Sequence, residues 1–268
     1  MSAKVNSWKN ETQKQWNTTP CGTVPSKEEN LEYFLAVEHR RYEDRAPWLK
    51  PLIRFDNYKE KKVLEVGFGQ GTDLCQFALG GADCYGVDLT QRHYELAKKN
   101  FALRGLKAEL HWTDASKLPF PDESFDLVYS FGVLHHTPDT NRCIGEIFRV
   151  LKPGGEFILG VYHHWSIRYW FSTLLQQGLL KGDLKKLGYQ GLLSTIERGA
   201  DGINIKPLVK LYTSKQLRIM LSDFQKVSFQ VRQLRRSDFG PLKKMIPNFV
   251  FPHLETKMGF FLFAKATK

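Results

Sequence analysis

A short apolar stretch that runs directly into three closely spaced glycines constrains this chain more than any other feature. Residues 62–66 are apolar enough for a buried strand, and Gly67, Gly69 and Gly71 follow at alternate positions, before a helix-like segment. Glycines at such a turn let the backbone reverse and approach a ligand closely, and a helix that begins there presents unpaired N–H groups. The pattern predicts a strand, a turn and a helix, with a nucleotide-like ligand held at the turn.

A second apolar run, residues 83–87, is followed by Asp88, about twenty residues after the turn. In a nucleotide-binding βαβ unit, an acidic residue at this spacing binds the ribose hydroxyls. The glycine spacing separates two kinds of ligand. A dinucleotide turn needs Gly or Ala where this chain has Thr72, because Gly71 comes one residue early. Glu65 would repel a pyrophosphate but would pair with an ammonium group. A ligand with a ribose, an ammonium and no phosphate fits these residues, and S-adenosylmethionine is such a ligand.

With these residues the chain resembles the class I S-adenosylmethionine-dependent methyltransferases, whose acidic-x-Gly-x-Gly-x-Gly turn is matched by residues 65–71. Further matches follow in the family's order: Asp114-Ala115 after a strand at 108–112, a turn and strand at 118–130, Leu134-His135-His136, and a helix end and turn at 149–155. The resemblance covers roughly residues 60–161 and is most similar in pattern to the ubiquinone and menaquinone biosynthesis type. It bears on fold and cofactor, but not on the acceptor.

The resemblance implies that S-adenosylmethionine is the cofactor and that the motif residues bind it. Asp88 would accept the ribose hydroxyls, and Asp114 would contact the adenine amino group. Tyr42, on a predicted N-terminal lid, would hydrogen-bond the methionyl carboxylate, although a core tyrosine fits the pattern equally well. The full predicted set is Glu65, Gly67, Gly69, Gly71, Asp88, Leu89, Asp114, Ala115, Ser130 and Tyr42.

Apolar runs alternate with helix-like segments from residue 61 to residue 161, as in a parallel sheet covered on both faces. The predicted strands are 62–66, 83–87, 108–112, 125–130, 156–161, 226–234 and 258–266, with a helix at 214–222 capped by Thr213-Ser214. The resemblance implies that the last two strands pair antiparallel at the sheet edge. We therefore expect an α/β fold: a doubly wound, Rossmann-like, mostly parallel seven-stranded sheet with an antiparallel C-terminal edge strand, N-terminal helices and an insertion after strand five.

A chain of 268 residues with 42% hydrophobic content can bury one large core, so we expect a single domain. Its predicted parts are an N-terminal helical lid or extension (1–58), a cofactor-binding core (59–161), a substrate-site insertion (162–212) and a segment that completes the sheet (213–268). The aromatic and basic run within the insertion is compatible with a helix pair buried against the core or with a substrate lid. One or two amphipathic helices are expected at 27–56. For residues 1–26 the sequence suggests no role other than that of a lid or cover over the cofactor.

Candidate catalytic residues follow the predicted fourth and fifth strands, where doubly wound sheets bind ligands. An acceptor hydroxyl, thiol or acidic carbon must lose a proton, and His135 or His136 could take it because histidine titrates near neutral pH. The alternative is that one of them packs or caps the following turn. His163, with its neighbour His164, is the next candidate. Neither the cysteines nor the carboxylates are spaced as metal ligands, so we predict no metal site.

Absent motifs narrow the acceptor. Residues 130–133 are Ser-Phe-Gly-Val, where enzymes that methylate amino groups of adenine, cytosine or glutamine carry an N/D-P-P-Y/F segment, and no Pro-Cys nucleophile motif occurs. We therefore expect a methyltransferase for a small, lipophilic or natural-product-like acceptor, methylated at oxygen, carbon or nitrogen. The alternatives are a nucleic-acid methyltransferase, a binding protein that has kept the fold without turnover, and, least favoured, an oxidoreductase.

The C-terminal quarter is strongly basic. Residues 206–268 hold thirteen lysines and arginines against three acids, so most of the formal net charge of +11 lies there. Such a face attracts phosphate on nucleic acid, lipid head groups or a substrate, or simply keeps the protein dissolved. The apolar run at 245–252 beside it favours contact with a membrane surface or a lipophilic substrate. The N-terminus lacks the apolar core of a signal peptide, and the spacing of the cysteines does not indicate disulfide pairs. We therefore expect a cytoplasmic protein that could also contact a membrane surface peripherally. No oligomeric state is predicted.

Overall fold

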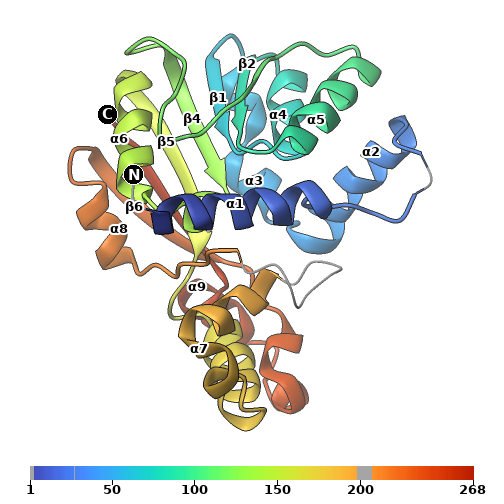
Figure 1. Ribbon diagram of the computed structural model, residues 1–268, viewed down its shortest axis with the longest axis vertical. Helices are drawn as coiled ribbons and strands as arrows, with labels where there is room; N and C mark the ends of the chain where they lie inside the picture. The colour runs from blue at the N-terminus through green and yellow to red at the C-terminus, as the bar shows by residue number, and fades with distance from the viewer. Residues whose placement is uncertain (1–2, 27, 198–206) are drawn as a thin grey trace.

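The computed structural model describes residues 3–26, 28–197 and 207–268, and these form an α/β fold around one seven-stranded sheet (Figure 1). The strands are β1 (Lys62–Val66), β2 (Asp83–Asp88), β3 (Glu109–Trp112), β4 (Phe125–Phe131), β5 (Leu151–Tyr162), β6 (Gln225–Arg232) and β7 (Phe261–Thr267), in the order β3-β2-β1-β4-β5-β7-β6. β1 to β5 are mutually parallel, and β7 pairs antiparallel with both β5 and β6. The predicted doubly wound, mostly parallel sheet is confirmed, and its last two strands form the expected antiparallel pair, with β6 outermost.

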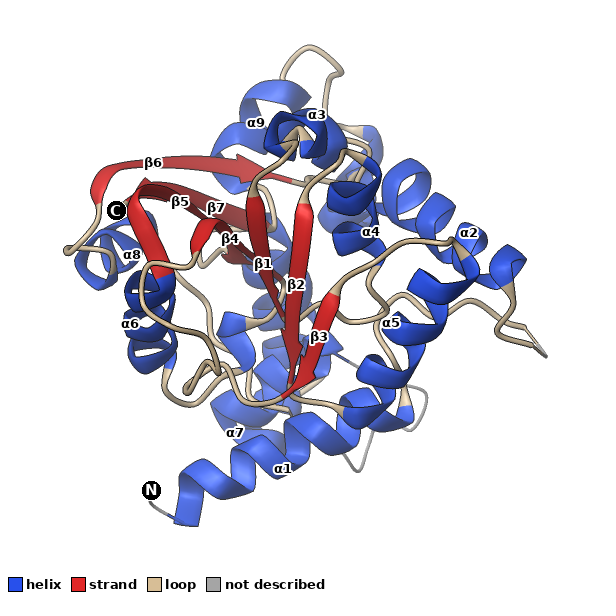
Figure 2. Ribbon diagram, turned by 90° about the horizontal axis from the view of Figure 1, so that it is seen from above, coloured by secondary structure: helices blue, strands red, loops and turns tan. Residues whose placement is uncertain are grey.

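Helices cover both faces of the sheet (Figure 2). α4 (Thr72–Leu79) and α5 (Gln91–Leu103) pack on one face, in a core that includes Leu74, Phe77 and Phe101. α6 (Thr140–Val150) and α8 (Ser214–Met220) pack on the other, in a core that includes Ile144 and Leu217. α8 begins as predicted, because the Thr213 hydroxyl accepts from the Gln216 N–H in a complete capping box.

Several helices precede β1, and they lie in different places around the sheet. α2 (Leu31–His39), a π-helical turn (Arg40–Arg45) and α3 (Leu49–Ile53) confirm the helices expected at 27–56, and a 3₁₀ turn (Phe55–Tyr58) follows. α1 (Ala3–Thr18) lies within the predicted helical extension at 1–58, but no individual helix was expected there, because its sequence is polar and lacks an apolar stripe. Figure 2 shows α1 running across the ends of β1, β2 and β3. Its side chains bind the loops there: Gln13 donates to the Leu89 carbonyl oxygen at 3.1 Å.

The insertion after β5 forms a helical layer of its own below the sheet edge (Figure 1). A π-helix (Arg168–Leu180) packs against α7 (Asp183–Ser194), a 3₁₀ turn (Thr195–Glu197) follows, and the C-terminal turn η6 (Arg236–Lys244) and α9 (Phe251–Met258) complete the C-terminal part. A small core joins the insertion to the sheet through Tyr162, Tyr169 and Phe260. No helix in the described ranges is both long and apolar enough to cross a bilayer.

Candidate active site

The three glycines after β1 form the turn that the sequence predicts. Gly67, Gly69 and Gly71 all have positive φ, of 81°, 56° and 75°. A Cβ on Gly67 would lie only 2.2 Å from a methyl carbon of Val133, so this position needs glycine for space as well as for conformation. No atom lies within 4 Å of a Cβ placed on Gly69, which leaves that part of the turn open to a ligand.

A cavity of about 600 Å³ lies beside this turn, at the carboxyl edge of the sheet. Seven of the predicted cofactor residues line it: Glu65, Gly67, Gly69, Asp88, Leu89, Asp114 and Ala115. Gly71, Ser130 and Tyr42 are not among the lining residues. Ser130 donates to the Val66 carbonyl oxygen at 3.0 Å and Tyr42 donates to Asp73 at 2.6 Å, so both hydroxyls already have protein partners. A direct cofactor contact for those three residues stays a prediction without support from the geometry.

Glu65 carries a buried acceptor that has no donor. Its side chain is only 4% exposed, and its Oε2 has no hydrogen-bond partner among the described residues. Burial, together with the negative charge of nearby Asp73, raises the pKa of Glu65 well above its usual value. A cation in the cavity would supply the missing donor and offset the cost of burying the carboxylate. The amino-acid ammonium of S-adenosylmethionine therefore fits this position.

Asp88 is held as a carboxylate at the end of β2. Burial alone would raise its pKa, but neighbouring His93 and hydrogen bonds from the Thr90 N–H and hydroxyl hold the pKa below its usual value. Its Oδ1 accepts from Thr90 at 2.9 Å and 2.8 Å, while its Oδ2 accepts from the Gly69 N–H at 3.0 Å. The glycine turn and the carboxylate are thus fixed to each other, and the side chain faces the cavity where a ribose would lie.

Asp114 is engaged by a residue that the sequence analysis missed. Lys9 of α1 forms an ion pair with Asp114 Oδ2, and the Ser116 N–H donates to Oδ1 at 2.8 Å. Burial alone would raise the pKa of Asp114, but these two donors hold it below its usual value. Because Asp114 is the predicted adenine contact, α1 is bound to the site at the point where the adenine would sit. A pattern search could not have found Lys9, since one lysine on a polar helix carries no signal.

A second network fixes the N-terminal segment to the glycine turn. Asp73, in the first turn of α4, forms a two-point ion pair with Arg41 and accepts from the hydroxyls of Tyr42 at 2.6 Å and Tyr129 at 2.8 Å. Its side chain is buried, so these four hydrogen bonds are needed to satisfy the carboxylate. Arg41 lines the cavity as a result, with its guanidinium 5.0 Å from the centre of the Phe131 ring. The sequence analysis expected Tyr42 to bind the cofactor's carboxylate rather than Asp73, and it named neither Arg41 nor Asp73 as a site residue.

Of the three histidines predicted as catalytic candidates, only His136 lines the cavity, at its far end. His136 is buried, and its Nδ1 lies 2.7 Å from the Leu208 carbonyl oxygen, so Nδ1 carries the proton and Nε2 is left as the basic nitrogen. Burial lowers the pKa of His136, which keeps the ring neutral near pH 7. His135 lies behind the wall, with its ring centre 3.8 Å from that of Tyr162 and no hydrogen-bond partner for either nitrogen among the described residues. His163 is not brought to the cavity; its Nδ1 lies 3.1 Å from the Gly259 carbonyl oxygen.

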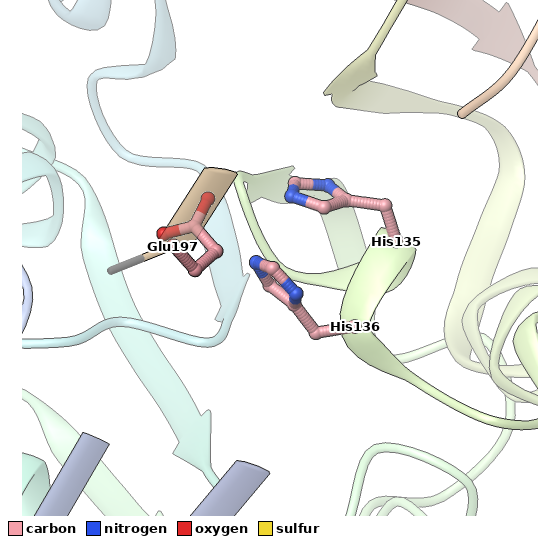
Figure 3. A group of neighbouring side chains, drawn as sticks. All are labelled: His135, His136 and Glu197. Atoms are coloured by element: carbon pink, nitrogen blue, oxygen red, sulfur yellow. The ribbon is translucent and has the colours of Figure 1, made fainter. Parts of the chain in front are cut away.

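Figure 3 shows Glu197, from the insertion, pointing towards both histidines. One ligand atom from each of His135, His136 and Glu197 lies within 4.8 Å of the others, so the described residues include one group able to hold a cation. No metal site was predicted from the sequence, because Glu197 joins the histidines only through the fold. The Tyr162 hydroxyl donates to Glu197, and burial and this carboxylate raise the pKa of Tyr162 well above its usual value. His136, Tyr162 and Glu197 all line the cavity, which gives this end a neutral base beside a hydroxyl–carboxylate pair.

Comparisons with known proteins identify the family that the central part of the chain resembles. Residues 64–159 match the family model of the methyltransferase domain. The chain is 42% identical over 99 residues to the phthiotriol/phenolphthiotriol dimycocerosates methyltransferase of Mycobacterium tuberculosis, and 34% identical over 134 residues to the sterol 24-C-methyltransferase of Neurospora crassa. These matches cover 36% and 46% of this chain, but they span only 36% and 35% of the two relatives.

A crystal structure of an S-adenosylmethionine-dependent methyltransferase from Methanosarcina mazei is similar in fold. The superposition has a TM-score of 0.58 at 24% sequence identity and covers 81% of this chain and 97% of that one. At this identity the likeness concerns the fold alone. The matched domain, the sheet and the glycine turn beside an unpartnered Glu65 lead to one conclusion: residues 64–159 form a methyltransferase domain of the class I, S-adenosylmethionine-dependent type.

Proposed function

We propose that this protein transfers the methyl group of S-adenosylmethionine to a small, lipophilic acceptor. The observation that carries the proposal is the division of one cavity into two chemically different ends. One end holds the glycine turn, the unpartnered Glu65 and the ionised Asp88. The other is walled by aromatic rings and holds a buried, neutral His136. A polar donor and an apolar acceptor would meet between them.

The donor end is suited to S-adenosylmethionine, which supplies an electrophilic methyl group on a sulfonium. Glu65 would bind the ammonium group, and Asp88 would accept the ribose hydroxyls. Gly69 keeps the backbone open, so the turn can approach the ligand. The ion pair between Lys9 and Asp114 lies over the adenine position, so α1 would cover the bound donor and exclude water. These residues would align the methyl group for in-line displacement, for which positioning supplies much of the rate.

At the acceptor end, His136 would take the proton that an acceptor hydroxyl or acidic carbon must lose. Its Nδ1–H donates to the Leu208 carbonyl oxygen, and this hydrogen bond fixes the orientation of the ring. The unprotonated Nε2, on the other side of the ring, is the nitrogen that would accept the proton. Glu197 is near enough to stabilise the imidazolium that forms, and its negative charge acts to raise the pKa of His136 against the effect of burial. Tyr162 donates to Glu197 and fixes its position.

Two features support a lipophilic acceptor over nucleic acid. Rings of Phe131, Tyr162, Phe260 and Phe261 line the acceptor end, and a largely apolar wall suits a molecule that is itself apolar. The two relatives named above act, by their names, on phthiotriol dimycocerosates and on sterols. Met245 and Phe249 are 74% and 85% exposed, and we propose this part of the surface for contact with a membrane or with an aggregated lipophilic acceptor.

The proposed function is tested by following tritium from methyl-labelled S-adenosylmethionine. The protein is incubated with the donor and with lipid extract, total RNA or DNA in parallel. Label that partitions into organic solvent, and that needs both donor-site and acceptor-site residues, is the expected result. Label recovered in nucleic acid alone would contradict it. Phe249→Ser should reduce label transfer to vesicle-embedded acceptors and leave transfer to detergent-dispersed acceptors unchanged; an equal rate with vesicles would refute the membrane contact.

A further inference from the structure

Three arginines from distant parts of the chain meet on one side of the cavity. Arg45 ends the π-helical turn after α2, Arg168 begins the π-helix of the insertion, and Arg235 follows β6. All three line the cavity, and an Arg235 Nη2 donates to the Arg45 carbonyl oxygen at 3.2 Å. The fold therefore gathers three guanidinium groups at a position that no single sequence segment indicates.

These charges are not balanced by ion pairs. None of the three guanidinium groups forms a salt bridge with a carboxylate in the described parts of the chain. This includes Glu43 and Asp44, the exposed acidic residues next to Arg45 in the sequence. Asp238 is buried and accepts the Arg235 backbone N–H at 2.8 Å, and the charges of Arg168 and Arg235 oppose the rise that burial causes in its pKa. Partial burial, and then the positive charges of Arg40, Arg235 and Arg168, lower the pKa of Arg45. Like charges this close together repel one another, and an anion bound between them would relieve that repulsion.

Arg168 connects this group to the acceptor end of the cavity. The Arg168 guanidinium stands 4.4 Å from the centre of the Phe260 ring, and the Phe260 and Tyr162 ring centres are 4.3 Å apart. Tyr162 in turn bonds Glu197, which faces His136. The donor's ammonium and ribose already have partners at the other end, in Glu65 and Asp88. The positive group is therefore placed to bind a part of the acceptor that lies beyond the atom to be methylated.

We propose that Arg45, Arg168 and Arg235 form an oxyanion site, and that the acceptor is an amphiphile with an apolar body and a carboxylate or phosphate group. This inference rests on the proposed function for the identity of the acceptor end, but not for the existence of the anion site. The apolar body would lie along Phe260 and Phe261 while the oxyanion accepts hydrogen bonds from the guanidinium groups. Guanidinium groups bind carboxylate and phosphate through paired hydrogen bonds, which gives orientation as well as affinity.

The test measures binding of decanoate, decyl phosphate and neutral decanamide by calorimetry, with and without S-adenosylhomocysteine. We expect each anionic probe to bind at least about tenfold more tightly than decanamide, since a charged hydrogen bond contributes about that factor. The ratio of decanoate to decyl phosphate affinity identifies which oxyanion the site prefers. Arg168→Gln and Arg235→Gln should each remove most of the advantage over decanamide. Arg218→Gln is the matched control: it removes the same charge from exposed α8, outside the cavity, and should change nothing.

Two results would overturn the anion site. One is equal binding of decanoate, decyl phosphate and decanamide by the wild-type protein. The other is a loss of S-adenosylmethionine affinity in Arg168→Gln and Arg235→Gln with the probe preference intact, because the arginines would then serve the donor. If S-adenosylmethionine does not bind at all while the anionic probes keep their advantage, the proposed function fails and the anion site stands. Circular dichroism and unchanged decanamide binding establish that the variants are folded.

Discussion

Replacing Glu65 by glutamine should weaken donor binding and stabilise the ligand-free protein at the same time. The carboxylate is buried, and one of its oxygens has no partner among the described residues, so that oxygen gains a donor only when a cation binds. A hydrogen bond to a charged group contributes about 1.5–3 kcal/mol, which corresponds to about 10- to 150-fold in affinity. Calorimetry should therefore show S-adenosylmethionine binding to Glu65→Gln weakened by this factor.

The matched control ligand is 5′-methylthioadenosine, which carries the adenine and ribose but no ammonium group. Its affinity should be the same for Glu65→Gln and for the wild-type protein, because it makes no use of the carboxylate. An equal loss of affinity for both ligands would mean that the substitution distorts the glycine turn. Unchanged affinity for S-adenosylmethionine would refute the assignment of Glu65 to the ammonium.

The same substitution changes how stability depends on pH. The pKa of Glu65 is raised in the folded protein above its usual value of 4.5, so the folded state binds the proton more tightly than the unfolded chain does. The contribution of Glu65 to stability is therefore greatest below pH 4.5 and is lost as the pH rises towards the folded pKa. Urea unfolding of ligand-free protein at pH 7 should show Glu65→Gln more stable than wild type by about 1 kcal/mol, with the difference shrinking below pH 4.5. A wild-type protein that is the more stable at pH 7 would refute the reasoning.

Two further substitutions test the turn and the base. Gly67→Ala should destabilise the fold by at least about 2 kcal/mol in urea unfolding, because its φ is 81° and its Cβ would lie 2.2 Å from Val133. Gly105→Ala has a similar φ of 65° but open space, so it should cost only about 1 kcal/mol, and equal losses would show that the clash is unimportant. His136→Asn should lower kcat by about 10²- to 10⁴-fold for an acceptor that loses a proton, without changing S-adenosylmethionine affinity. Burial lowers the pKa of His136 below 6.5, so the rate of the wild-type enzyme should fall only at pH values below 6.5, where the base becomes protonated. If His136→Asn shows the same fall in rate at low pH, His136 is not the base.

The fold was predictable from sequence because its signals are local. Apolar runs and the glycine turn located the parallel strands to within a few residues, and Thr213 marked the start of α8. β5 begins at Leu151 rather than at residue 156, but its regular pairing with β4 starts at Glu156. The turn indicated by Pro153, Gly154 and Gly155 is present as an irregularity within the strand, where Gly154 has a φ of 76°. α1 was missed because a polar helix is stabilised by its contacts, such as that of Gln13 with Leu89, and not by an apolar stripe.

Site residues were predictable only where they belong to a motif. Glu65, Gly69 and Asp88 follow directly from the strand and turn pattern, and all three line the cavity. Glu197 and the arginine group were not predicted, since tertiary packing alone brings the insertion and the segment after β6 to the sheet edge. His163 was expected near the site because it closely follows β5, but its Nδ1 faces the Gly259 carbonyl oxygen away from the cavity.

The glycine turn, Glu65 and Asp88 together are assigned to binding S-adenosylmethionine. The decisive measurement is titration calorimetry of the wild-type protein and of Asp88→Ala with S-adenosylmethionine and, separately, with NAD. S-adenosylmethionine should bind the wild-type protein, Asp88→Ala should lose most of that affinity, and NAD should give no heat of binding. Tight binding of NAD, or S-adenosylmethionine affinity that does not depend on Asp88, would contradict the account.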